Sequence, residues 1–238
     1  GGFTAQVHSY SIAAGLAILP HILGDIRSIR NVTSWRDIAK HTKLFVSVGG
    51  IGLKNTQVEP GGAGEHASGQ WLPRLAKAGV EVVSITPLRD DTAEILNATW
   101  LAPRPNTDTA LMLGLAHTLV TEDLHDKAFL ARYCTGFEQF LPYLMGTGDG
   151  QPKNAEWAAD ISEIDAETIR TLARKMASRR TMIGTAYSLQ RGDHGEQPFW
   201  MTAVLGAMLG QVGLPGGGFG FGYGSMNAQG KAVNRIAA

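Results

Sequence analysis

The sequence predicts an α/β fold in which a mostly parallel sheet is flanked by helices. Leu44–Val48 is a short, largely β-branched run that leads into a glycine-rich loop, which is the pattern of a buried strand. A similar run at 80–85 follows a segment, about 66–78, with apolar residues at helical spacing. Strand, crossover helix and strand in this order predict a parallel pair, arranged in Rossmann-like layers.

An apolar helix is expected before the first strand. From Ser11 to Leu23 the residues are apolar nearly all round, with a serine at the start and Pro20 inside. This pattern indicates a buried, kinked helix that begins at Ser11.

The remaining elements follow from periodicity and helix start signals. Trp100–Ala102 is a short apolar segment, and Thr107 or Asp108 can cap the apolar helix that follows it. Asp165 opens a helix whose apolar residues recur at i, i+3, i+4 and i+7. Further elements are helices at 126–133 and 137–145, a strand at 181–184, an apolar segment at 199–212, and a glycine-rich segment at 214–220 that cannot sustain a helix.

The composition excludes several function classes. Lys plus Arg and Asp plus Glu number 21 each, so no net charge favours nucleic acid as a partner. Cys134 is the only cysteine, which excludes an internal disulfide and a cysteine-ligated zinc or iron–sulfur centre. No apolar run reaches the roughly 20 residues needed to cross a bilayer, so we expect no membrane insertion.

The loops beyond the strand ends direct the search for a site, because ligands of parallel sheets bind there. Gly50-Ile51-Gly52 invites a nicotinamide-dinucleotide interpretation. The third glycine of that pattern would fall on Asn55, and Thr86 stands where a ribose-binding acid is needed, which argues against it. The polar residues of these loops are Lys54, Asn55, Thr56, Thr86, Arg89, Tyr187, Ser188 and Arg191.

Several segments resemble one family. In chain order they are Tyr10-Ser11 at a helix start, Asn106–Asp108 with the helix that follows, Phe137–Leu144, Gln190-Arg191 with Gly195-Glu196-Gln197, and Met208–Gly220. They are similar to the dimethyl sulfoxide, trimethylamine N-oxide and biotin sulfoxide reductases, and Phe137–Leu144 looks closest to the trimethylamine N-oxide branch. Because these segments extend across nearly the whole chain, they are more specific than a lone glycine motif.

The resemblance implies that Ser11 is a molybdenum ligand and the catalytic residue. The family binds molybdenum bis(molybdopterin guanine dinucleotide), and the protein adds a serine oxygen within a Tyr-Ser sequence. An ionised oxygen is a hard ligand, and a helix N-terminus favours its negative charge. From the residues alone, the alternative is that Ser11 is an N-cap. Ser9 and Ile12 depart from the acidic residue and the threonine usual in the family.

The resemblance also assigns one guanine dinucleotide to the strand-end loops. Asp108 would accept from guanine N–H groups or ribose hydroxyls, and Arg191 would donate to a phosphate or pterin oxygen. The alternatives are a helix cap for Asp108 and a surface ion pair for Arg191. Thr86 replaces the family's usual aspartate. The implied cofactor-binding residues are Lys54, Asn55, Thr56, Ile85, Thr86, Asn106, Thr107, Asp108 and Arg191, with Tyr187 and Ser188 in place of a Trp-Gly pair.

The implied activity is reduction of an S- or N-oxide, of the trimethylamine N-oxide or dimethyl sulfoxide type, by oxygen-atom transfer in anaerobic respiration. An electron donor such as a cytochrome c would be a partner. A leader absent from this chain would place the enzyme in the periplasm, with the cytoplasm as the alternative. A non-catalytic nucleotide-binding α/β module and an NAD-dependent dehydrogenase stay open as other functions.

The chain begins without methionine and stops just after a glycine-rich stretch, so we expect an internal fragment of a larger multidomain enzyme, inactive alone. The enzyme's remaining domains would be its partners. Three parts are expected: a metal-ligand segment with a buried helix (1–24), a guanine-dinucleotide-binding α/β domain (25–192), and a helix with a glycine-rich segment returning to a neighbouring domain (193–238).

Overall fold

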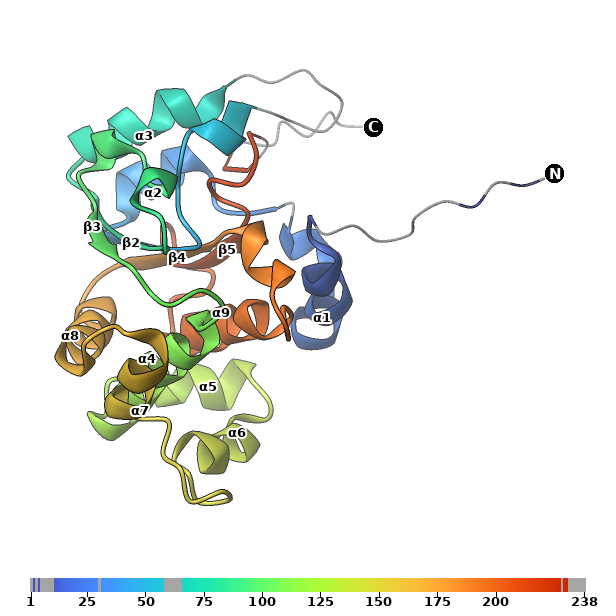
Figure 1. The fold of residues 1–238 in the computed structure, drawn as a ribbon, viewed down its shortest axis with the longest axis vertical. Helices are drawn as coiled ribbons and strands as arrows, with labels where there is room; N and C mark the ends of the chain where they lie inside the picture. Colours follow the sequence, from blue (N-terminus) through green and yellow to red (C-terminus); the bar gives the residue numbers. More distant parts are fainter. Residues whose placement is uncertain are drawn as a thin grey trace.

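A five-stranded sheet lies at the centre of the computed structural model, which describes residues 2, 4, 11–29, 31–57, 66–227 and 229–230 (Figure 1). The strands stand in the order β3-β2-β1-β4-β5, and every neighbouring pair is parallel. The prediction of a mostly parallel α/β sheet is confirmed. The strand bounds are β1 Leu44–Val48, β2 Glu81–Ile85, β3 Thr99–Leu101, β4 Thr181–Thr185 and β5 Gly218–Phe221.

The strand order reverses at β1. Val48, the last residue of β1, is level with Ile85 of β2 and with Thr185 of β4. The chain adds β2 and β3 on one side of β1, and β4 and β5 on the other. The loops after β1 and β4 therefore diverge at a switch point, which is where open α/β sheets form ligand crevices.

Helices cover both faces of the sheet (Figure 1). One face packs against α2 (Trp35–His41) and α3 (Ala67–Lys77), and the other against α4 (Asp108–Thr121), α8 (Ala166–Ala177) and α9 (Gln197–Met208). Both faces are buried, which explains why β1 is apolar at nearly every position. Beyond α4 lie α5 (Lys127–Tyr133), α6 (Phe137–Leu144) and α7 (Ala155–Ser162).

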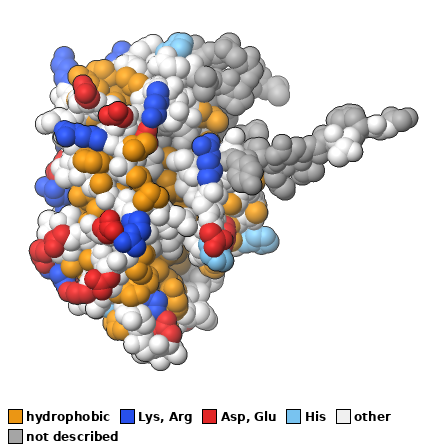
Figure 2. All heavy atoms as spheres, in the orientation of Figure 1, with side chains coloured by type: hydrophobic (Ala, Val, Ile, Leu, Met, Phe, Trp, Pro, Cys, Tyr) orange, Lys and Arg blue, Asp and Glu red, His pale blue; other side chains and the backbone are white. Residues whose placement is uncertain are grey.

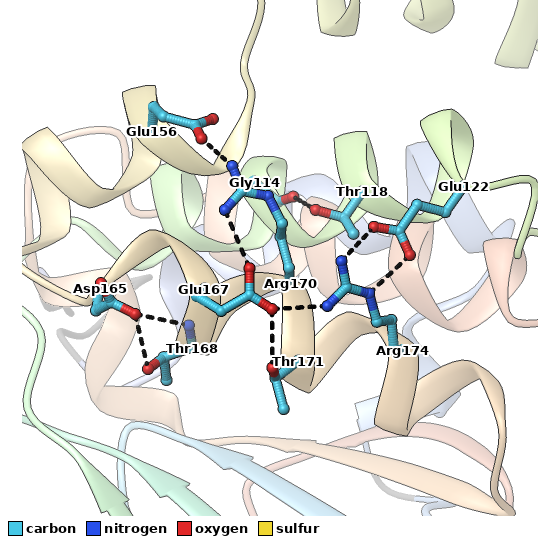
Figure 3. Close-up of polar contacts among 10 residues, drawn as sticks. All are labelled: Gly114, Thr118, Glu122, Glu156, Asp165, Glu167, Thr168, Arg170, Thr171 and Arg174. Atoms are coloured by element: carbon cyan, nitrogen blue, oxygen red, sulfur yellow. Dashed lines mark hydrogen bonds and ion pairs between the residues drawn. The ribbon is translucent and has the colours of Figure 1, made fainter.

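Ion pairs join α8 to α4 and α7 (Figure 3). The guanidinium of Arg174 donates to both carboxylate oxygens of Glu122, at the end of α4, at 2.8 Å each. Arg170 pairs with Glu156 of α7, and Glu167 accepts from Arg174 at 2.7 Å. These side chains are partly exposed, so solvent screens each pair, and the pairs mainly orient α8.

The β3 edge of the sheet carries exposed apolar side chains. Figure 2 shows hydrophobic side chains in a band across the face seen in Figure 1, with charged side chains on both sides. Leu88, Ile95 and Trp100, which follow β2 or lie on β3, are exposed, and the Arg89 guanidinium lies 5.9 Å from the Trp100 ring centroid. Among the described residues, no further strand pairs with β3.

The N-terminal helix differs from its prediction. Helix α1 spans Ala13–Leu23, so it begins two residues after Ser11, and only Gly15 and Leu19 are fully buried. It packs by one face against α9 and β5, which leaves the rest of its apolar surface partly exposed. The prediction of a buried helix from Ser11 is therefore wrong in its start and its burial, and the kink at Pro20 stays a prediction.

The sequence analysis missed α2, α7 and β5. Ser34 Oγ accepts the Asp37 N–H at the start of α2, and Asn154 Oδ1 accepts the Trp157 N–H at the start of α7, so both helices have ordinary N-caps. Strand β5 alternates glycine with phenylalanine, and its pairing with β4 overrides its poor strand propensity. This part of the 193–238 segment belongs to the sheet, while the three-part division of the chain stays a prediction.

Gly184→Ala tests the packing of the sheet. A methyl group added at Gly184 would lie 2.5 Å from Cζ of Phe45 and 3.1 Å from Cδ2 of Tyr223. We expect the free energy of unfolding to fall by about 1–3 kcal/mol, because overpacking displaces buried side chains. Gly69→Ala in α3 is the control, since a methyl group there meets no atom within 4 Å and helical alanine stabilises by up to about 1 kcal/mol. Urea unfolding of the 238-residue chain compares them, and equal stabilities would contradict this packing.

Candidate functional site

The loops after β1 and β2 pack against each other. Lys54 Nζ lies 2.5 Å from Asp91 Oδ1, and the Ile51 N–H donates to the Asp91 carbonyl at 2.7 Å. The hydrogen bond to the Asp91 carboxylate raises the pKa of Lys54. Lys54 is therefore held as a cation at the carboxyl edge of the sheet, beside an exposed Asn55.

Two predicted threonines in these loops are buried. Thr56 Oγ1 donates to the Leu53 carbonyl at 2.8 Å, which stabilises its own turn. The Thr86 carbonyl accepts the Trp100 indole N–H at 2.8 Å. The side chain of Ile85 lies in the core, and its carbonyl accepts the Gly49 N–H at 2.8 Å, so Ile85 shapes the edge rather than offering a side chain.

The loop after β3 borders a cavity of about 450 Å³. Asp108, the first residue of α4, is half-buried in the cavity wall, and desolvation raises the pKa of its carboxyl to about 6. Thr107 occupies the N-cap position, but its hydroxyl donates to the Arg104 carbonyl at 2.6 Å, and α4 has no side-chain cap. The prediction that Thr107 or Asp108 caps α4 is therefore wrong. The cavity is lined by Asn106, Asp108, Thr109, Tyr143, Asp193, His194, Gln197 and Pro198.

The loop after β4 forms a short 3₁₀ helix, η5 (Tyr187–Arg191). Tyr187 is buried, its N–H donates to Ser225 Oγ at 2.8 Å, and its hydroxyl accepts from Gln229 Nε2 at 2.6 Å. Ser188 and Arg191 are exposed. Gly192 lies so close to Asn106 that an added Cβ would be 2.0 Å from Asn106 Oδ1, so the loops after β3 and β4 meet there.

The first turn of α1, just after Ser11, contacts the loop after β4. The Ala14 N–H, in the first turn of α1, donates to Gln190 Oε1 at 2.7 Å. Ile12 occupies the N-cap position of α1 without a side-chain capping bond, so the alternative role of Ser11 as an N-cap is wrong. Ser11 is exposed, and its neighbour Tyr10 lies outside the described residues.

All predicted site residues in the strand-end loops thus lie at one edge of the sheet, in two groups. The Lys54 loop packs with the β2 loop, and the Asn106–Asp108 loop meets the β4 loop, which also contacts the Ser11 segment. Sequence reasoning missed Asp91, Tyr143, His194 and Gln190. Gln190 and Tyr143 carried a signal, because both lie in segments that the resemblance had already singled out.

These features define a class of protein: a parallel α/β domain with a ligand site beyond the carboxyl ends of its strands. The chain belongs to the molybdopterin oxidoreductase family, whose model matches residues 63–236. No helix in the described part of the chain is long and apolar enough to span a membrane.

Relatives of known name match most of this chain. Biotin sulfoxide reductase of Cereibacter sphaeroides is 48% identical over 97% of this chain and 31% of its own length. Dimethyl sulfoxide/trimethylamine N-oxide reductase of Rhodobacter capsulatus is 44% identical over 99% of this chain and 29% of its own. Trimethylamine-N-oxide reductase 1 of Escherichia coli (strain K12) is 48% identical over 90% of this chain and 26% of its own length. The chain therefore spans less than a third of these relatives, and the identities do not separate the branches.

The fold also matches a solved structure. Acetylene hydratase from Pelobacter acetylenicus superposes with a TM-score of 0.64 over 87% of this chain and 26% of that chain, at 22% sequence identity. At this identity the likeness shows the fold alone.

Asp108→Asn tests the desolvation of the cavity wall. The pKa of Asp108 rises from 3.8 to about 6 on folding, so the folded state binds the proton more tightly between these values. The free energy of unfolding should fall by roughly 1–3 kcal/mol as the pH rises from about 4 to about 6. The variant should lack this fall and be the more stable protein above pH 6. Denaturant unfolding across this pH range measures it, with Asp160→Asn, at an exposed site on α7, as the control. If the free energy of unfolding depends on pH in the same way in Asp108→Asn and in the wild type, the raised pKa of Asp108 is refuted.

Proposed function

We propose that the complete protein is a molybdenum-dependent reductase of S- or N-oxides, of the trimethylamine N-oxide or dimethyl sulfoxide type. Family membership and the names of the relatives support this. The observation that carries it for this chain is the meeting of the Ser11 segment with the β4 loop, at the edge where the loops predicted to hold a nucleotide also lie. Electron supply by a donor such as a cytochrome c, a periplasmic location and a role in anaerobic respiration belong to the same proposal.

The cavity beside Asp108 fits the nucleotide end of a molybdopterin guanine dinucleotide. Its volume of about 450 Å³ falls in the range of small-ligand sites. Asp108 is a desolvated carboxylate, and Asn106 adds amide donors and acceptors from the same loop. A carboxylate can accept two N–H groups from one edge of guanine. The residues therefore suit the guanine nucleotide end of the proposed cofactor.

Each part of the edge then has a task. Asp108 and Asn106 would bind the base or ribose, and the exposed guanidinium of Arg191 would donate to a phosphate or pterin oxygen. Lys54 would place a positive charge near the phosphates, while Thr56, Thr86 and Tyr187 stabilise the loops through their own hydrogen bonds. The Ser11 oxygen would ligate the metal. When bound, the cofactor supplies the two-electron chemistry that removes the substrate oxygen.

A non-catalytic nucleotide-binding module is the alternative. It would use the same cavity but would contain no metal. Molybdenum analysis of the complete protein, together with release of a guanine nucleotide on acid treatment, distinguishes the two, since a module without molybdenum would contradict the proposal.

The isolated 238-residue chain should hold no stoichiometric molybdenum. It spans 26–31% of its relatives, so most of the contacts of a cofactor with two dinucleotides would lie outside it. Metal analysis after reconstitution with the cofactor measures this. Stable binding at one molybdenum per chain would show that the site is complete here.

Ser11→Ala and Ser11→Asp in the complete enzyme test metal ligation. Ser11 does not cap α1, so Ser11→Ala should change the free energy of unfolding by less than the roughly 1 kcal/mol that a lost cap costs. Oxide reduction should nevertheless fall by orders of magnitude. Ser11→Asp should also be damaged, with an altered molybdenum spectrum, because its longer side chain misplaces the oxygen.

Ser34→Ala is the matched control, because it removes a side-chain cap from a different helix, α2. It should lower stability by about 1 kcal/mol and leave the spectrum unchanged. Unchanged turnover and spectrum in Ser11→Asp would remove Ser11 from the metal site.

A further inference from the structure

Helix α1 begins without a cap of its own. Ile12 at the N-cap position makes no side-chain hydrogen bond, and the first turn contains no acidic residue. The first N–H groups of a helix have no partner within the helix, so they need an acceptor from elsewhere. Gln190 Oε1 supplies one, 2.7 Å from the Ala14 nitrogen and 176 residues away in the sequence.

The other contacts of α1 are apolar. A methyl group added at Gly15 would lie 2.9 Å from Cε1 of Phe199, so the helix backbone lies directly against that ring. Leu19 is fully buried beside Phe199 and Phe221, whose ring centroids are 5.2 Å apart. Such packing holds α1 against α9 and β5, but it is not directional and does not by itself set the position of α1 along its axis.

The hydrogen bond from Ala14 provides that direction. Gln190 is 7% exposed and lies in η5, so its side chain is held by its surroundings. Ser11 precedes Ala14 by three residues, and Arg191 follows Gln190 directly. The amide oxygen of Gln190 therefore links the segment that contains Ser11, the proposed metal ligand, to the loop that contains Arg191, the proposed donor to a phosphate or pterin oxygen.

We propose that Gln190 is a positioning residue that sets Ser11 relative to the β4 loop through its hydrogen bond to the Ala14 N–H. This inference rests on the proposed role of Ser11. Gln190 does not act on the substrate itself. An amide suits the task because a buried neutral acceptor costs less to desolvate than a buried carboxylate.

The test uses the complete, cofactor-loaded enzyme. Gln190→Met keeps the length of the side chain and removes the acceptor, whereas Gln190→Glu keeps an acceptor oxygen at the same reach. Gln211→Met is the matched control, because Gln211 is also buried and accepts the Thr181 N–H at 2.8 Å, at the start of β4 and so at the opposite edge of the sheet.

Three measurements read the result. In Gln190→Met, hydrogen exchange of the Ala14 amide should accelerate by about 3- to 10-fold, as expected for one lost hydrogen bond. The molybdenum electron paramagnetic resonance spectrum should change. The value of kcat should fall, while KM should stay within about two-fold of the wild-type value. Gln190→Glu should restore the wild-type spectrum. Gln211→Met should lower stability and leave the spectrum unchanged.

Several outcomes would overturn the proposal. One is that Gln190→Met, at full molybdenum content, keeps the wild-type spectrum and the wild-type kcat. Another is that Gln211→Met shows the spectral change expected of Gln190→Met. Should Gln190→Met fail to fold, Gln190→Asn, which shortens the reach by one methylene, must show the change instead. Ser11→Ala is measured in parallel: if it leaves the spectrum unchanged, the proposed metal ligand has failed, and if it alone alters the spectrum, only the role of Gln190 has failed.

Discussion

The parallel pairing of β1 with both β2 and β4 is the constraint on which the rest of the structure depends. Because Val48, Ile85 and Thr185 are level, the three following loops leave the sheet at the same height. Residues more than 100 positions apart in the sequence, such as Val48 and Thr185, are thereby brought together without any contact between their own loops being required. The register of the strands therefore determines which loops lie together at this edge, and the loops supply the side chains of the site.

The N-terminal segment reaches that edge by a different route. It is not part of the sheet, and its position depends on the small apolar cluster that Leu19, Tyr187, Phe199 and Phe221 form with the partly buried Ile12. Ile12 stands where the resemblance to the family implies a threonine. Packing in this cluster, rather than a hydroxyl, therefore holds the residue that follows Ser11. Apolar packing and one directional hydrogen bond, from the Ala14 N–H to Gln190 Oε1, together replace the cap that α1 lacks.

Local pattern predicted those elements whose stability is mostly local. The β-branched run of β1 and the i, i+3, i+4, i+7 spacing of α8 gave the correct class and nearly the correct ends. Strand β5 could not be predicted, because glycines at 218 and 220 are poor strand formers and only β4 makes them a strand. The cavity beside Asp108 was equally invisible: Tyr143 and His194 reach it from separate elements, and neither occurs in a motif that indicates a ligand. The strand-end rule located the edge, but the grouping of its residues depends on tertiary packing.

The state of Asp108 links the stability of the domain to its proposed ligand. Desolvation raises the pKa of this carboxyl to about 6, so near neutral pH the folded chain holds a charge in a poorly solvated position. A ligand that donates two N–H groups to the carboxylate would compensate that cost and return the pKa toward its ordinary value. Binding would then stabilise the fold by more than its contact area alone suggests, because it also removes a destabilising term from the folded state. A desolvated acid of this kind favours a neutral donor such as a purine edge over an anion, which would add a second negative charge to the same wall.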